Sequence, residues 1–268
     1  MKEEIKRILS SHAFLACTLI LFVTFQGYSF PTLFYERFHP LVVHDPEGWE
    51  SAATMIFGSF AFGSISLILP VCGSYLGAKS QIADIHDGIL PCLLIRASRR
   101  RYMFIKAVSA FVCGAFSGFL AFGSHMILWH LISKPYDLVR WPELDGVFQG
   151  IYQSIQHIGY GLPVYVLSLV GFAFVCGCWS TIGVCLGMLV PDSLLVLLLT
   201  LSIKEIWNRS LYLILKFTGV FFLAVTDTLF NDPPGVPNML ASMLIYLCLI
   251  AILLIFYWKK LRPTSSKS

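Results

Sequence analysis

The sequence predicts an all-α membrane protein with six transmembrane helices, built as a single domain over residues 1–268. Hydrophobic residues make up 57% of the chain, charged residues make up 13%, and the mean hydropathy is +0.75, which lies outside the range of soluble domains. The charges gather between long uncharged runs, as expected where helices cross a bilayer. No linker rich in Ser, Gly or Pro divides the chain, so we expect one domain. The net charge of +4 gives no reason to expect nucleic acid as a partner.

Five uncharged runs are long enough to cross the membrane without help. An apolar helix of about 20 residues spans the hydrocarbon core of a bilayer. The runs that meet this requirement cover residues 12–30, 52–76, 107–132, 162–190 and 239–258.

The crossing before the last run is harder to assign. Residues 193–203 are uncharged, but as a helix they reach only about 16 Å, which is too short to span. We therefore expect a helix that continues past Lys204, which belongs to the outer side. Glu205 and Arg209 pair there four residues apart on the helix. A re-entrant or interfacial segment through Leu229 then leads to the sixth span.

The basic residues determine the predicted orientation, because Lys and Arg are retained on the cytoplasmic side during insertion. Most of them lie before residue 12, between the second and third runs, and after the last run. Both termini are then cytoplasmic. Residues 1–10 are predicted to form either an amphipathic interfacial helix, with Ile5 and either Ile8 or Leu9 against lipid, or the flank of a signal anchor. The basic residues expected at the headgroups are Lys2, Lys6 and Arg7.

The segment between the second and third runs is the most charged part of the chain. It reads DGILPCLLIRASRRRYMFIK over residues 87–106. This segment resembles the type-2 ABC transporter permease family, whose small bacterial members have an acidic residue and a glycine here, then an apolar stretch and R-x-S-R/K-x-x-Y-x-x-x-K leading into the next span. The residues that match are Asp87, Gly88, Arg96, Ser98, Arg99, Tyr102 and Lys106. Pro91 interrupts the apolar stretch, and His86 and Asp87 stand where a glutamate and a basic or small residue are commoner in the family.

The resemblance implies that this segment holds a cytoplasmic coupling helix, which docks into a groove of a separate ATPase subunit. The docking residues that it implies are Asp84, Asp87, Gly88, Arg96, Ser98, Arg99, Arg100, Tyr102 and Lys106. The implied partners are two ATPase subunits, which bind the ATP and Mg, and a second permease copy or a related permease. This chain would then carry no cofactor and no catalytic site. The setting implied is the bacterial cytoplasmic membrane, with export of a peptide, such as a bacteriocin, or another amphipathic substrate.

The main alternative is a stand-alone secondary transporter or an intramembrane enzyme. Carriers driven by an ion gradient usually place a charged residue or a broken helix at the midplane, and the five clear runs contain no charged residue. Gly73, Gly77, Lys79 and Ser80 resemble a phosphate-binding loop, but their spacing is wrong and they end a membrane helix. The arginines at 96–101 could also act only as topology signals and ligands of lipid headgroups.

Overall fold

The computed structural model describes residues 1–38, 63–96, 98–132, 162–218 and 236–260. Nearly all of these residues are helical, so the all-α prediction is confirmed for the described part of the chain. The helices are α1 (Lys2–Leu9), α2 (His12–Phe38), α4 (Gly63–His86), α5 (Ile89–Arg96), α6 (Arg99–Ile132), α8 (Leu162–Leu189), α9 (Ser193–Thr218) and α10 (Val236–Lys260).

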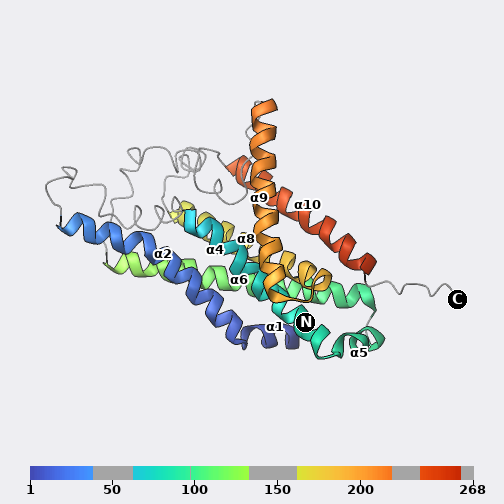
Figure 1. The fold of residues 1–268 in the computed structure, drawn as a ribbon. Coiled ribbons are helices and arrows are strands. Elements are labelled where there is room, and N and C mark those ends of the chain that lie inside the picture. The colour runs from blue at the N-terminus through green and yellow to red at the C-terminus, as the bar shows by residue number, and fades with distance from the viewer. Residues whose placement is uncertain (39–62, 97, 133–161, 219–235, 261–268) are drawn as a thin grey trace.

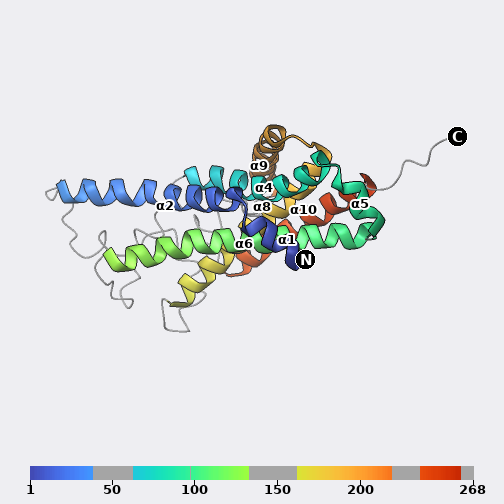
Figure 2. The same ribbon diagram turned by 90° about the horizontal axis from the view of Figure 1, so that it is seen from below.

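Helix α8 lies at the centre of the arrangement. It packs against α4 on one side and α6 on the other, and it also contacts α9 and α10. Helices α2, α4, α6 and α8 run lengthwise together, whereas α9 stands across them in Figure 1 and is seen nearly end-on in Figure 2. The central position of α8 explains why its apolar residues are buried almost all round, as expected of a helix that is hydrophobic on every face.

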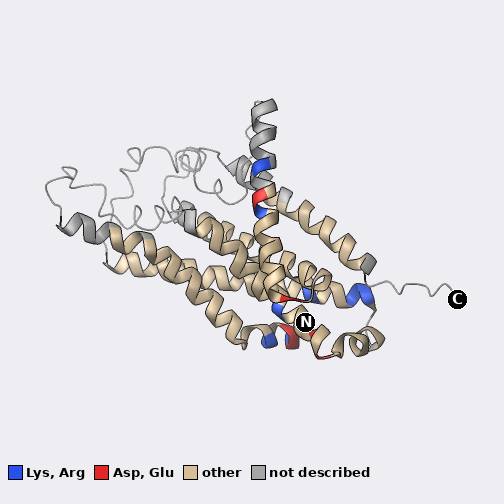
Figure 3. Cartoon of the chain, viewed as in Figure 1, with Lys and Arg blue, Asp and Glu red and all other residues tan. Residues whose placement is uncertain are grey.

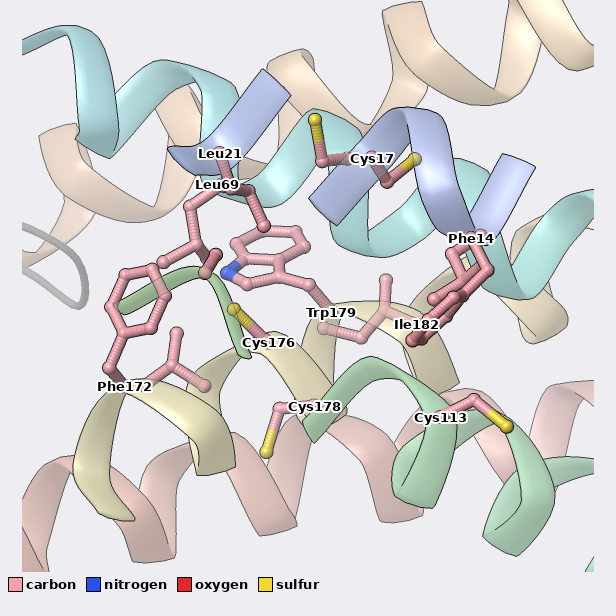
Figure 4. Packing of buried hydrophobic residues seen from close by; sticks show 14 of the residues in the cluster. Phe14, Cys17, Leu21, Leu69, Cys113, Phe172, Cys176, Cys178, Trp179 and Ile182 are labelled. Atoms are coloured by element: carbon pink, nitrogen blue, oxygen red, sulfur yellow. The ribbon is translucent and has the colours of Figure 1, made fainter. Parts of the chain in front are cut away.

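The core around α8 is built from aromatic and small side chains. Trp179 is 2% exposed, and its indole lies among Leu21, Leu69 and Cys176 in Figure 4. Its Nε1 donates a hydrogen bond of 3.2 Å to the hydroxyl of Tyr246 in α10. A buried indole N–H that finds a partner avoids the cost of an unsatisfied donor, so this bond fixes α10 against α8.

Glycines allow α4 and α8 to approach until their backbones touch. A Cβ atom added at Gly77 would collide with the backbone carbonyl of Ser180, and one added at Gly183 would collide with the backbone of Ser74. Small residues that permit such contacts are typical of helix pairs in membranes, where van der Waals packing rather than water exclusion drives association.

One end of the bundle collects the charged residues. Helices α1 and α5, the first turn of α6 and the last turn of α10 meet there (Figure 1), and the long helices carry few charges elsewhere apart from α9 (Figure 3). We call this the α5 end. Gly88 links α4 to α5 with a φ of 64°, a left-handed conformation that glycine adopts at little cost.

Three helices in the described part of the chain are long and apolar enough to cross a membrane. They lie in His12–Pro31, Arg99–Ile132 and Ser168–Leu189, and a shorter apolar helix covers Tyr246–Trp258. The first, third, fourth and last predicted runs are therefore helical where they are described, and the count of six spans stays a prediction.

Two predicted segments differ from the structure in extent. The second predicted run begins in residues that lie outside the described part, and α4 continues ten residues beyond position 76, to His86. Helix α9 extends without a break from Ser193 to Thr218, which confirms the helix expected past Lys204. The rest of the predicted re-entrant segment lies outside the described residues.

We expect Gly183→Ala to loosen the contact between α4 and α8, because the added methyl group meets the backbone of Ser74 and neither backbone can move independently. The melting temperature of the purified protein in detergent should fall by several degrees. Gly27→Ala in α2 is the control, because nothing lies within 4 Å of its added Cβ atom. An equal effect of both substitutions would contradict the close packing.

Candidate functional site

A group of charged side chains, of which Asp84 and Lys106 are buried, ties α1, α4 and α6 together at the α5 end. Asp84 lies at its centre with a side chain that is 1% exposed. Its Oδ2 is 2.6 Å from Lys106 Nζ, and its Oδ1 is 2.7 Å from Arg7 Nη1. The side chain of Lys106 is 3% exposed. We call Glu4, Arg7, Ser80, Asp84 and Lys106 the ion cluster.

Glu4 and Ser80 complete the ion cluster. Glu4 Oε1 accepts hydrogen bonds from Lys106 Nζ at 2.7 Å and from the Ser80 hydroxyl at 2.6 Å, and it also lies 2.8 Å from Arg7 Nη2. The Ser80 hydroxyl in turn accepts from Lys106 and Arg7, at 2.9 and 3.0 Å. Two carboxylates face two basic groups, so the ion cluster is neutral; Asp84 and Lys106 are held away from water, whereas the Arg7 side chain is 43% exposed.

A layer of neutral polar groups extends the ion cluster to α10. The Tyr102 hydroxyl lies 2.9 Å from Asp84 Oδ2 and 3.1 Å from Gln81 Oε1. The Tyr257 hydroxyl of α10 donates to the same Gln81 oxygen at 3.0 Å. Gln81, Tyr102 and Tyr257 are all at least 95% buried. Four helices that are distant in sequence therefore meet through one connected network.

The electrostatics of the ion cluster favour ionised carboxylates. Burial opposes the charge on Asp84, but the charge of Lys106 and the hydrogen bonds from Lys106 and Arg7 outweigh it, so the pKa of Asp84 lies below its ordinary value of 3.8. Burial likewise opposes ionisation of Glu4, while Lys106, Ser80 and Arg7 hold its pKa below 4.5. The pKa of Arg7 is raised, because its bonds to Asp84 and Glu4 outweigh the effect of burial.

Helix α5 has one packed face and one exposed face. Leu90, Leu93 and Leu94 follow helical spacing and pack against a small core that includes Tyr102 and Tyr257. On the other side Ile95 is 85% exposed and Ile89 is 41% exposed, with Pro91 and Cys92 also exposed. An exposed apolar surface beside basic residues is suited to contact with another molecule.

The predicted docking residues divide into two groups. Asp84, Tyr102 and Lys106 are buried, and their polar atoms bond to other parts of this chain. The remainder lie at or near the surface, beside the exposed face of α5, although the side chain of Arg96 is outside the described part. The exposed or partly exposed residues are Asp87, Gly88, Ser98, Arg99 and Arg100.

Two of these surface residues have local structural roles. The Ser98 hydroxyl accepts a hydrogen bond of 3.4 Å from the backbone N–H of Arg101, so Ser98 caps the first turn of α6. The guanidinium of Arg100 lies 5.6 Å from the ring centre of Trp258, a cation–π distance that joins α6 to the end of α10. Among the described residues, no group of three His, Cys, Asp or Glu side chains is placed to hold a metal ion.

The lipid-facing prediction for residues 1–10 is wrong. Ile8 is 4% exposed, and Ile5 and Leu9 pack against the main core. Arg7, which was expected at the headgroups, bonds instead to Asp84 and Ser80. An amphipathic pattern shows that one face of a helix avoids water, but it does not distinguish lipid from protein.

The sequence reasoning also missed Gln81, Ser80 and Tyr257 as members of the network. Ser80 and Asp84 are four residues apart, as are Tyr102 and Lys106, so each pair shares a helix face. Polar residues at this spacing next to an apolar run were the available signal. The residues that resembled a phosphate-binding loop have other roles, since Gly73 and Gly77 contact α8 and Ser80 belongs to the ion cluster.

Comparison of the chain with protein-family models, curated proteins and solved structures finds no match. The composition and the three apolar helices of the described part indicate a membrane protein.

We expect Asp84→Ala to be strongly destabilising, because it leaves the buried ammonium of Lys106 with only one carboxylate. Loss of one partner from a buried ion pair costs about 3–5 kcal/mol. Asp87→Ala is the matched control: Asp87 is exposed and lies one turn away, and surface substitutions usually change stability by less than about 0.5 kcal/mol. Unfolding curves in detergent would measure both. Similar losses for the two variants would contradict the central role of Asp84.

The lowered pKa values of Glu4 and Asp84 predict a loss of stability in acid. A carboxylate with a lowered folded-state pKa stabilises the protein above its unfolded-state pKa, and this contribution is lost as the pH falls through the folded-state pKa. The melting temperature should therefore be nearly constant from about pH 7 to 5 and fall below about pH 4. In Asp84→Asn the fall should be shallower, and an unchanged slope would argue against ionised Asp84.

Proposed function

We propose that this chain is the membrane-spanning subunit of an ATP-driven transporter of the ABC type, and that α5 is its coupling helix. The chain would cross the membrane six times and pair with itself or a related permease, with two ATPase subunits bound at the α5 end. The resemblance in residues 87–106 is the starting point of the proposal. The observation that most supports the proposal is that α5 has an exposed face and is connected to both α4 and α6.

A coupling helix has to meet two physical requirements. It needs an exposed surface that a soluble subunit can hold, and it needs a stiff connection to the spans that must move. The exposed side chains of Ile89 and Ile95, which Arg99 and Arg100 follow in the sequence, suit the first requirement. Apolar contacts ringed by charge are the usual composition of a protein interface.

The stiff connection is supported by the ion cluster and by the polar groups that extend it to α10. Helix α5 follows α4 after Gly88 and precedes α6 by two residues, and the Asp84–Lys106 pair links the same two helices at 2.6 Å. A displacement of α5 would therefore be passed to α4 and α6 together, and through Gln81 and Tyr257 to α10. Packed elements with fixed hydrogen bonds move as units rather than deforming gradually.

The remaining parts of the proposal follow from the sequence. The positions of the basic residues favour a cytoplasmic location of both termini and of the α5 end, and the resemblance suggests the bacterial cytoplasmic membrane. ATP and Mg would bind to the ATPase subunits. The exported substrate would be a peptide or another amphipathic molecule, which suits a chain with 15% aromatic residues.

The proposal is tested by isolating the full-length chain from its native membrane and identifying any ATPase subunit that accompanies it. The amount of that subunit and the rate of ATP hydrolysis are then measured. We expect the amount and the rate to fall at least about tenfold in Ile95→Glu, because a carboxylate buried in an interface without a partner costs about 2 kcal/mol or more. The double variant Asp87→Ala, Arg99→Ala should lose ATPase coupling while the chain still inserts.

Lys2→Ala is the control for this experiment, since it removes an exposed charge from α1 and leaves α5 unchanged. Uphill transport or catalytic turnover by the purified chain without any companion would overturn the proposal and favour a stand-alone carrier or an intramembrane enzyme.

A further inference from the structure

Three cysteines from three different helices lie close together in the core. Cys17 belongs to α2, Cys72 to α4 and Cys176 to α8, and each is at most 5% exposed. Figure 4 shows Cys17 and Cys176 around Trp179. A Cβ atom added at Gly73, next to Cys72, would lie 3.2 Å from the carbonyl oxygen of Cys176. Both of the other sulfur atoms act electrostatically on Cys72, so the three thiols share one region.

Within this group, Cys17 and Cys72 contact each other directly. Their thiols are hydrogen-bonded across the contact between α2 and α4. Cys176 is turned toward α6, because a Cβ atom added at Gly118 would lie 2.6 Å from its Sγ. A disulfide requires Cβ atoms about 3.5–4.5 Å apart, a condition that only contacting side chains on neighbouring backbones can meet. The contact therefore selects Cys17 and Cys72 as the pair able to form a bond.

A basic group lies near this pair on the side of the α5 end. Lys79 follows Cys72 by seven residues on α4, so the two share a face of that helix. Its ammonium acts electrostatically on the sulfur of Cys17. Reactive cysteines in proteins commonly have a basic group nearby, because the thiolate is the nucleophilic form of the side chain.

The position of α2 gives a small oxidant a route to the pair. Of the three long apolar helices, the span in α2 is the least buried and the span in α8 the most buried. Leu15 and Leu19, on either side of Cys17 in the sequence, are 68% and 58% exposed. Elements with few buried contacts open locally at lower cost than central ones. A displacement of α2 therefore exposes Cys17 while α8 stays in place.

We propose that Cys17 and Cys72 form a reversible disulfide when the protein meets a peroxide. The thiolate of one cysteine attacks a peroxide oxygen, the O–O bond breaks, and the products are a sulfenic acid and a hydroxide that takes up a proton to become water. The second thiol attacks the sulfenic sulfur, the S–S bond forms and a second water leaves. The pair loses two hydrogen atoms, and hydrogen peroxide is reduced to water. A thiol reductant reverses the reaction by exchange.

The disulfide would tie α2 to α4, the helix that leads into α5. At the same level α2 already contacts α6, where the hydroxyls of Thr18 and Ser117 are 2.8 Å apart. The oxidised protein would therefore hold α2, α4 and α6 together, whereas the reduced protein leaves α2 bound to α4 by noncovalent contacts. Formation of the disulfide does not depend on an ATPase partner.

The test uses the full-length protein, purified in detergent with a reductant that is then removed. Its exposed thiols, Cys92 and Cys248, are replaced by serine, because they would react on their own. Hydrogen peroxide is added, free thiols are alkylated, and mass spectrometry of the intact protein and its peptides locates any disulfide. The variants are Cys17→Ser and Cys72→Ser. Cys185→Ser is the control, since Cys185 is a buried thiol of the second core cluster.

We expect peroxide to link the peptides of Cys17 and Cys72 in the parent protein and in Cys185→Ser, with loss of the mass of two hydrogen atoms. The yield of disulfide should fall at least about tenfold in Cys17→Ser and in Cys72→Ser, and dithiothreitol should restore both thiols in the parent. The melting temperature should rise by several degrees on oxidation, because the cross-link constrains the unfolded chain.

A second sample, unfolded in denaturant before peroxide is added, shows that the reagents can oxidise these thiols. If both thiols of the folded protein stay reduced while the unfolded sample forms disulfides, the proposal is overturned. A disulfide that joins either Cys17 or Cys72 to Cys176 would also overturn it, because the reactive pair would then be a different one.

Discussion

The ion pair between Asp84 and Lys106 is the interaction on which the arrangement at the α5 end depends. Both side chains are removed from water, so each needs the other to stay charged. Arg7 pairs with Asp84 and Glu4 pairs with Lys106, and with the buried side chain of Ile8 these contacts hold α1 on the bundle. Tyr102 and Gln81 then carry the network to Tyr257. Helices α4, α6 and α10 consequently share one fixed register at this end.

The remainder of the bundle is held by close packing rather than by charge. Helix α8 touches α4 through glycine and serine backbones and meets α10 through the bond between Trp179 and Tyr246. In a bilayer such contacts matter because lipid chains are as apolar as the side chains that they would replace. Ion pairs therefore hold the helices together at the α5 end, and close packing holds them together along the rest of their length.

Local patterns in the sequence were sufficient to predict where the helices lie, but they were insufficient to predict which helices pack against one another. Long apolar runs predicted the all-α membrane class, and the four-residue spacing predicted the pairing of Glu205 with Arg209, which the structure confirms at 3.9 Å. The bond between Arg7 and Asp84 joins residues 77 positions apart, and no local pattern reveals which helices become neighbours. The same limit explains the error at Ile8, whose side chain is buried against protein.

The order of the network along the chain has a consequence for biogenesis. Glu4 and Arg7 are synthesised before Asp84 and Lys106, and Tyr257 follows them. Glu4 and Arg7 can therefore bond to each other first, whereas their bonds to Asp84 and Lys106 wait until α4 and α6 have been made. The complete network at this end of the molecule can therefore form only after α10 has been made.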